Sequence, residues 1–277
     1  MHQLTRQAIQ PITAGTPQSN AENIRSALAR GVSEFTYPAP FYHDGNMVIV
    51  GSGPSVTSFL DEIKEERSIG RPICAIKGAH DWLIDNGVMP DLFVSCEPRD
   101  RPLRHVSDTC CYMLASRCSP SLFDQLQGKR VIMWHSLASK PGFIPPVKAK
   151  IEWDDLNVEE ECEAFRGKPI SIGGGSTSGL RAVTIAYQLF GFRNIHLYGF
   201  DSCLASDRKT KRFTGEDVGN GIVVDVIVGG RRFWCNGAMA AQASEFQDVI
   251  NSMPGVNLKI KGDGLLAAIL KARRAKA

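Results

Sequence analysis

Short apolar runs alternate along most of the chain with segments whose apolar residues recur at helical spacing. The runs cover residues 47–50, 73–76, 92–96, 111–115, 131–134, 170–172 and 195–198. Helical spacing is found over 56–66, 80–86, 120–127 and 178–190. Short apolar strands that alternate with amphipathic helices are typical of βαβ units, whose strands run parallel and are covered on both faces. The pattern predicts a Rossmann-like α/β fold with a mostly parallel sheet.

The two ends of the chain depart from this alternation. Residues 1–45 contain one segment of helical spacing, 21–30, and a Pro-Ala-Pro break at 38–40, which predicts an N-terminal arm or helix. Residues 206–219 are polar and charged and predict a mobile loop after Asp201. Gly229 and Gly230 separate two apolar runs, which predicts a hairpin insertion, and helices are expected over 238–253 and 265–275. We expect residues 46–277 to form one nucleotide-binding domain.

Composition narrows the class of protein. The 277 residues carry 32 basic and 29 acidic side chains, a net charge of +3, which gives no signal for a nucleic-acid partner. No apolar stretch reaches the length of a membrane span, and the first ten residues lack the apolar core of a signal peptide. The eight cysteines include no CxxC pair, so a zinc site is unsupported and free thiols are expected. We therefore expect a cytoplasmic protein without a membrane partner.

Two glycine-rich turns follow predicted strands. The first, Gly51-Ser52-Gly53-Pro54-Ser55, places a proline at the start of a helix, and its glycines would allow close approach of a ligand. The second contains Gly174 and Gly175 and adds the hydroxyls of Ser176, Thr177 and Ser178 before an apolar helix. Helix N-terminal amides attract anions, so both turns are candidate phosphate sites. No Gly-Lys-Ser/Thr is present, which disfavours a P-loop; a tight turn without a ligand is the structural alternative for each.

Charged residues follow three other predicted strands. Lys77 comes after the second strand, Glu97 and Arg99 after the third, and Asp201 after the last. The carboxyl ends of parallel strands meet at one sheet edge, where ligands of open α/β sheets bind. Glu97 and Asp201 are candidates for metal or substrate contacts, with solvated loops or turn caps as the alternatives. His196 lies within a predicted strand and is interpreted as a core histidine.

These segments, in this order, resemble the MptE-like family, which includes 6-hydroxymethylpterin diphosphokinase. The resemblance rests on Gly51–Ser55, Gly78–Asp91, Gly174–Gly179, Leu197–Asp201, Phe233–Phe246 and Ile260–Leu266. It implies a nucleotide-dependent transferase that moves diphosphate from ATP to a small alcohol with Mg²⁺. On that basis Lys77 and Arg99 would offset phosphate charge, and Glu97 and Asp201 would hold the metal or orient the acceptor.

Partial similarities leave the chemistry open. The block 78–100 is similar to thiamine pyrophosphokinases, but Lys77 stands where those enzymes tend to have an acid, and Cys96-Glu97-Pro98 replaces most of an acidic pair. Segments 51–55 and 177–201 also resemble bacterial sialyltransferases, although no histidine follows His196 to act as their late base. A glycosyltransferase that uses a nucleotide sugar on a glycan acceptor, and a nucleotide-binding protein without turnover, are the alternatives. A homo-oligomer is also left open.

Overall fold

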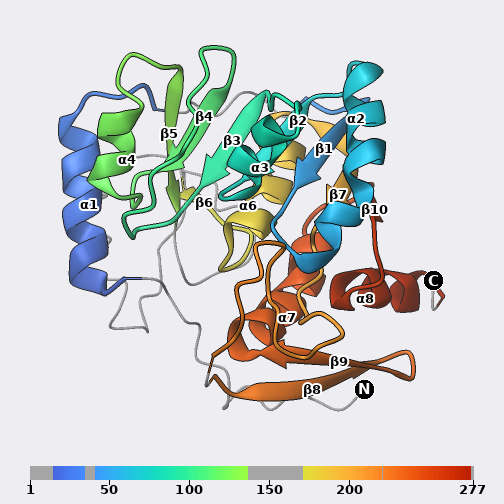
Figure 1. Ribbon diagram of the computed structural model, residues 1–277. Coiled ribbons are helices and arrows are strands. Elements are labelled where there is room, and N and C mark those ends of the chain that lie inside the picture. Colours follow the sequence, from blue (N-terminus) through green and yellow to red (C-terminus); the bar gives the residue numbers. More distant parts are fainter. Residues whose placement is uncertain (1–14, 35–40, 137–170, 220, 276–277) are drawn as a thin grey trace.

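The computed structural model describes residues 15–34, 41–136, 171–219 and 221–275, and within them eight parallel strands form one sheet (Figure 1). The strands are β1 (His43–Val50), β2 (Ile73–Ile76), β3 (Leu92–Ser95), β4 (Cys111–Ala115), β5 (Val131–Ser136), β6 (Ser171–Ile172), β7 (Phe192–Tyr198) and β10 (Asn257–Ile260). Helices cover both faces, which confirms the predicted Rossmann-like α/β class.

The order of the strands places a reversal in the middle of the sheet. From one edge to the other the order is β10-β7-β1-β2-β3-β4-β5-β6. The chain moves outward from β1 to β6 and then returns to β7, on the other side of β1. Val48 accordingly pairs with Ile73 on one side and with His196 on the other. Ligands of open α/β sheets bind outside the carboxyl ends of the strands at such a reversal.

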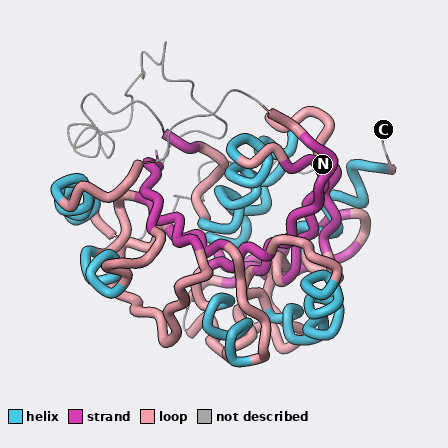
Figure 2. Tube along the Cα trace, turned by 90° about the horizontal axis from the view of Figure 1, so that it is seen from above, coloured by secondary structure: helices cyan, strands magenta, loops and turns pink. Residues whose placement is uncertain are grey.

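The helices form a layer on each side of the sheet, as Figure 2 shows from above. The 3₁₀ turn η2 (Pro54–Phe59), α2 (Leu60–Ser68) and α3 (Ala79–Asp85) contribute to one apolar cluster with β1 and β2. The other face carries α6 (Ser178–Thr184), which continues as a π-helical turn, η3 (Ile185–Leu189). Each of the two predicted helices at 56–66 and 178–190 is therefore divided into segments of different geometry.

The N-terminal helix of the described chain, α1 (Pro17–Ala29), packs beside β5 and contacts α4 (Pro120–Gln125) (Figure 1). The amide of Asn23 on α1 donates to the carbonyls of Pro98 and Arg117, at 3.1 Å each, which ties this helix to the loops that follow β3 and β4. The division of the chain into an arm and a main domain stays a prediction.

The hairpin predicted around Gly229 and Gly230 is confirmed. Strands β8 (Val223–Val228) and β9 (Arg231–Asn236) pair antiparallel, and both glycines have the positive φ that a two-residue hairpin turn requires. Next come α7 (Gly237–Asn251), whose N-terminus Asn236 caps, and α8 (Leu265–Arg274). Among the described residues, no helix has both the length and the apolar character needed to cross a bilayer.

The sequence pattern missed β10. This strand has four residues, and only Leu258 is fully buried because β10 lies at the sheet edge and pairs with β7 alone. A short edge strand with one buried position has too little apolar character to stand out from a loop. Its place matters for function, because β10 leads directly into the segment 261–265 that packs against the loop after β7.

Candidate functional site

A cleft of about 200 Å³ opens at the reversal of the sheet. Its walls come from the loops after β1, β2 and β7, from the start of α6, and from two later segments. The lining residues are Gly51, Ser52, Gly53, Pro54, Ile76, Lys77, Thr177, Ser178, Gly179, Gly199, Phe200, Asp201, Ser202, Cys203, Lys211, Arg212, Met239 and Gln242. Seven of the sequence-predicted site residues are among them: Gly51, Ser52, Gly53, Lys77, Thr177, Ser178 and Asp201. Ser55 does not line the cleft, but its amide donates to Asp201.

The glycines of the first turn are explained by close approach to the loop after β7. A Cβ at Gly51 would lie 2.8 Å from the carbonyl oxygen of Gly199, and one at Gly53 would lie 2.2 Å from Oδ2 of Asp201. Gly199 has a φ of 67°, a left-handed backbone that glycine adopts without strain. The two loops can therefore touch along their backbones, and together they form one wall of the cleft.

The amides of the first turn are largely engaged by the protein itself. Gly51 donates to the carbonyl of Tyr198 at 2.8 Å, Gly53 to that of Gly199 at 2.9 Å, and Ser55 to Oδ2 of Asp201 at 3.1 Å. The sequence predicted that these amides would bind phosphate. In the structure these three amides are bonded to the end of β7 and to the loop that follows it; phosphate binding at this turn stays a prediction.

Asp201 lies at the junction of three segments. Its carboxylate accepts the Ser55 amide, and its carbonyl accepts the amide of Leu265 at 2.8 Å. A Cβ at Gly264 would come within 2.5 Å of the Asp201 Cα, so this segment also packs directly on it. Burial raises the pKa of Asp201 above its usual value, despite the stabilising bond from Ser55. A carboxylate with a raised pKa in a cleft is suited to accept a proton.

Glu97 is held between two cations next to the cleft. Its carboxylate accepts bonds from Lys77 Nζ at 3.0 Å, from Arg99 Nε at 2.6 Å and from Arg99 Nη2 at 2.9 Å. Burial alone would raise the pKa of Glu97, but the bonds from Arg99 and Lys77 lower it to about 2. Lys77 lines the cleft and Glu97 does not, so the carboxylate positions the ammonium group from behind.

Lys77 also has an unusual backbone. Its φ is 50°, and the only other non-glycine residues with positive φ in the described chain are Ser202 and Arg208. Lys77 and Ser202 both line the cleft. Left-handed backbone costs free energy for residues with a Cβ, and such residues concentrate at functional sites.

The first part of the second glycine-rich turn, Gly174 to Ser176, contacts other parts of the protein and does not reach the cleft. Gly174, with φ 110°, lets the turn pass beside Thr184, and a Cβ at Gly175 would meet Leu180 at 2.7 Å. The amide and hydroxyl of Ser176 both donate to Oε2 of Glu245 on α7, at 2.8 Å each. These three residues do not line the cleft. A carboxylate of the protein already fills the anion position that the sequence predicted at Ser176.

Thr177 and Ser178 do face the cleft. Thr177 Oγ1 caps α6 by accepting the Leu180 amide at 3.2 Å, and it also accepts from Gln242 Nε2 at 3.0 Å. Ser178 Oγ accepts the amide of Cys96 at 3.1 Å, which links α6 to the end of β3. Gln242 was not predicted as a site residue, although it belongs to the segment 233–246 that carries part of the family resemblance.

The loop 205–219 supplies two cations that the sequence interpretation did not assign to the site, Lys211 and Arg212. The amide of Phe213 donates to the carbonyl of Ser52 at 3.2 Å, and its ring lies 5.5 Å from that of Trp82 on α3. These contacts hold the loop against the first glycine turn. The signal in the sequence was the basic character of this loop, directly after Asp201.

The described residues do not fit a Mg²⁺ ion held by the protein. Both oxygens of Glu97 accept bonds from cations, and Oδ2 of Asp201 accepts the Ser55 amide. No group of three or more histidine, cysteine, aspartate or glutamate side chains in the described ranges could hold a metal. Mg²⁺ prefers several oxygen ligands in octahedral geometry, whereas this cleft presents cations.

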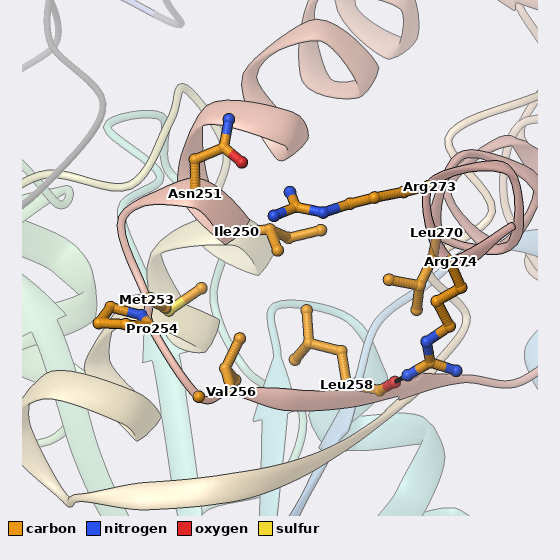
Figure 3. A pocket seen from close by; sticks show the side chains of 10 residues that line it. Ile250, Asn251, Met253, Pro254, Val256, Leu258, Leu270, Arg273 and Arg274 are labelled. Carbon is orange, nitrogen blue, oxygen red and sulfur yellow. Dashed lines mark hydrogen bonds between the residues drawn. The ribbon is translucent and has the colours of Figure 1, made fainter. Parts of the chain in front are cut away.

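A second hollow lies between the end of α7, β10 and α8 (Figure 3). Its floor is apolar, from Ile250, Met253 and Leu258, and the guanidinium of Arg273 extends over it. Arg274 Nη2 donates to the carbonyl of Leu258 at 2.7 Å and covers part of the sheet edge. No sequence-predicted site residue lines this hollow, and it lies away from the reversal of the sheet. The cleft is therefore the candidate site.

Comparisons with known proteins identify a family and a shared fold. The family model described as 6-hydroxymethylpterin diphosphokinase MptE-like matches residues 18–207. A search of the curated proteins found no match. Among solved structures, the chain is similar to a MAf glycosyltransferase from Magnetospirillum magneticum AMB-1, with 17% identity and a TM-score of 0.62. The match covers 92% of this chain but 38% of that one, and at this identity it shows a shared fold.

Proposed function

This chain belongs to the 6-hydroxymethylpterin diphosphokinase MptE-like family, and on that premise we propose that it is a nucleotide-dependent transferase whose donor binds in the cleft at the sheet reversal. The observation that carries the proposal is the pairing, in one cleft, of three cations with a single buried carboxylate. Lys77, Lys211 and Arg212 face the space that Asp201 also lines. Cations suit the phosphates of a nucleotide, and the carboxylate suits an acceptor hydroxyl.

Lys77 is the central phosphate ligand in this proposal. Glu97 fixes its ammonium group, and the strained backbone at Lys77 holds the side chain at the cleft wall. Preorganised cations stabilise charge that develops on a transferred or leaving phosphate without any reorganisation at the moment of reaction. Arg99, which is bonded to the same carboxylate, fixes Glu97 from the outer side.

Asp201 is the proposed base. In the default chemistry of the family, the acceptor hydroxyl oxygen attacks the β-phosphorus of ATP. The bond from that phosphorus to the oxygen bridging it to the α-phosphorus breaks, and AMP leaves. The proton of the hydroxyl passes to the Asp201 carboxylate, whose raised pKa makes it a better acceptor than an exposed aspartate. Lys77 offsets the charge that appears on the phosphate of AMP. The acceptor would be a small alcohol such as a hydroxymethylpterin.

A second candidate is glycosyl transfer from a nucleotide sugar. The observation that favours it is the engagement of Glu97 by Lys77 and Arg99, which leaves cations in place of a metal-binding carboxylate pair. Here the acceptor oxygen attacks the anomeric carbon, the bond from that carbon to the nucleotide phosphate breaks, and Asp201 takes the proton. The shared fold with a glycosyltransferase is consistent with this reaction on a glycan acceptor. A nucleotide-binding protein without turnover is the third candidate.

The test begins with binding. The unfolding temperature is measured with ATP, CMP, UDP and nucleotide sugars, each with and without Mg²⁺. A ligand at one hundred times its dissociation constant stabilises the fold by about 2.7 kcal/mol. Lys77→Met should remove the stabilisation, and Lys64→Met, which alters an exposed lysine on α2 outside the cleft lining, should keep it.

Turnover then separates the candidates. Release of AMP from ATP, dependent on a pterin alcohol, supports diphosphoryl transfer. Release of a free nucleotide from a nucleotide sugar in the presence of EDTA supports glycosyl transfer. Binding without product from any donor supports the protein without turnover, and the absence of any nucleotide binding overturns the proposal altogether.

A further inference from the structure

The loop 205–219 is part of the cleft wall. Backbone bonds join Ala205 to Thr210 and Lys211 to Glu216, both at 2.8 Å, and Val218 to Lys209 at 3.0 Å. Together with the docking of Phe213 on Ser52, these bonds hold the loop against the first glycine turn. Lys211 and Arg212 line the same cleft as Lys77.

One carboxylate of the same loop neutralises these two cations. Lys211 Nζ lies 2.9 Å from Oε1 of Glu216, and Arg212 Nη1 lies 3.2 Å from its Oε2. All three side chains are partly exposed, with Lys211 at 26%, Arg212 at 31% and Glu216 at 38%. Each oxygen of Glu216 thus meets one cation, an arrangement that two oxygens of a phosphate group can reproduce.

The charge of Arg101, in the loop after β3, also contributes to the pKa of Glu216. Burial alone would raise the pKa of Glu216, but the bond from Lys211 and the charges of Arg212 and Arg101 lower it below its usual value. Glu216 in turn contributes, after Glu97, to the raised pKa of Arg99. Glu216 is thus bonded to the two cations that line the cleft, and the charge of Arg101 also favours its ionised form.

The other acids of the loop have different partners. Asp207 accepts the amides of Lys209 and Thr210, at 2.8 and 2.9 Å, and Asp217 accepts the amide of Gly219 at 2.7 Å. Such bonds shape turns. Glu216 differs because both of its oxygens face the cations that line the cleft.

We propose that Lys211 and Arg212 form a second phosphate subsite, and that Glu216 occupies the position of an anionic group of the ligand. A ligand that binds there displaces the Glu216 carboxylate from these two cations. The inference rests on the proposed function, because it concerns an anionic ligand of the same cleft. The ligand class is a molecule with two neighbouring anionic groups, one at Lys77 and one at Lys211 and Arg212. Glu216 then sets the affinity of the cleft for such anions.

The experiment uses inorganic pyrophosphate as the probe, titrated into the full chain by calorimetry. Glu216→Gln removes the competing charge and should tighten pyrophosphate binding by about three- to ten-fold, since partly exposed ion pairs are individually weak. Asp217→Asn is the matched control, because it removes the same charge one residue away and keeps an oxygen to accept the Gly219 amide. It should bind pyrophosphate within about two-fold of the unaltered chain. Lys211→Gln should weaken binding.

The outcomes separate this inference from the proposed function. Tighter binding by Glu216→Gln that shrinks at high salt, with Asp217→Asn unchanged, supports the displacement of Glu216. Unchanged or weaker pyrophosphate binding by Glu216→Gln shows that Glu216 only positions the two cations. That result overturns the inference, and the proposed function stands. An equal gain in both variants reveals a general effect of net charge and also overturns it. If the unaltered chain binds neither pyrophosphate nor any nucleotide, both proposals fail.

Discussion

At the residue scale, Asp201 combines burial with a position in the cleft. Asp201 as a whole residue is 7% exposed. Its carboxylate accepts one backbone amide, and among the described residues no cation is bonded to it. Burial disfavours the ionised form, which is why the pKa is raised. A group whose native pKa lies above its unfolded value of 3.8 makes the fold less stable as pH rises between those two values. This cost is consistent with the role of base that we propose for Asp201.

Asp201→Asn should lower turnover by about 100-fold or more, the usual contribution of a general base. Stability at neutral pH should be unchanged or slightly higher, because the amide keeps an oxygen for the Ser55 amide and removes a buried charge. Turnover of the unaltered protein should rise with pH through the raised pKa of Asp201. Asp263→Asn, at a side chain that is 93% exposed, is the control. A variant that loses stability but keeps its turnover would identify Asp201 as a structural cap.

Glu97 shows the opposite electrostatic behaviour. Its pKa falls from 4.5 to about 2 because Arg99 and Lys77 stabilise the charged form. The native state therefore binds fewer protons than the unfolded state between these values. The contribution of Glu97 to stability is fully present above about pH 4.5 and is lost as pH falls toward 2.

The unfolding free energy should thus fall between pH 5 and pH 3, and Glu97→Gln should show a smaller fall over the same range. At pH 7 this variant should be destabilised by up to about 3 kcal/mol, from the size of the pKa shift. Urea unfolding at several pH values measures both effects. Glu65→Gln, on the exposed side of α2, should leave the pH dependence unchanged. Parallel pH profiles for Glu97→Gln and the unaltered chain would contradict the assigned ion pairs.

At the scale of elements, the loop 205–219 depends on few apolar contacts. Phe213 packs with Trp82 and joins the cluster of α2 and α3, while most of its neighbours along the loop are polar. Segments with few buried contacts open locally at low cost in free energy. The docked position is therefore sensitive to a single side chain and to charge in the cleft.

Phe213→Ala should release the loop without unfolding the sheet. Trypsin should then cut at Arg208, Lys209, Lys211 or Arg212 several-fold faster than in the unaltered chain. Saturating nucleotide should slow cleavage of the unaltered chain, because its phosphates would hold Lys211 and Arg212. Ile227→Ala, at an exposed position of the hairpin, is the control. Equal cleavage with and without ligand would contradict the predicted ordering of this loop by the ligand.

At the scale of the whole molecule, the cleft is assembled from distant parts of the chain. The first glycine turn, the loop after β7 and the segment after β10 meet around Asp201. Gly264 allows this contact, because a Cβ there would lie 2.5 and 2.7 Å from backbone atoms of Asp201. The last strand and helix thus position the candidate base, although they lie beyond the residues that the family model matches.

Gly264→Ala should therefore reduce both stability and turnover, since backbone atoms cannot move aside as a flexible side chain can. We expect a loss of about 1–3 kcal/mol, as for overpacked sites. Gly237→Ala at the start of α7 is the matched control: a Cβ there meets nothing within 4 Å, and alanine favours helix. Thermal unfolding and turnover of both variants provide the measurement. A Gly264→Ala protein as stable and active as the control would contradict the predicted contact.

The sequence by itself determined the type of fold and the edge on which the cleft lies. Side-chain periodicity reports local structure, so the alternation of apolar runs and helical segments was enough to predict a parallel sheet with helices on both faces. The paired glycines at 229 and 230 predicted the hairpin for the same local reason. Because parallel strands end at one edge, the sequence predicted that Gly53, Lys77, Glu97, Gly174 and Asp201 would face one cleft. Gly53, Lys77 and Asp201 line it, and Glu97 and Gly174 do not.

Only the tertiary structure decided how the polar groups are used. The amides of Gly51, Gly53 and Ser55 are bonded to the loop after β7, and Ser176 binds Glu245, 69 residues later in the chain. The partners of a donor depend on what the fold brings within about 3 Å, and no local pattern records contacts across such separations. For the same reason the sequence showed Lys211, Arg212 and Glu216 only as loop residues, and folding placed the two cations in the cleft wall with Glu216 bonded to both.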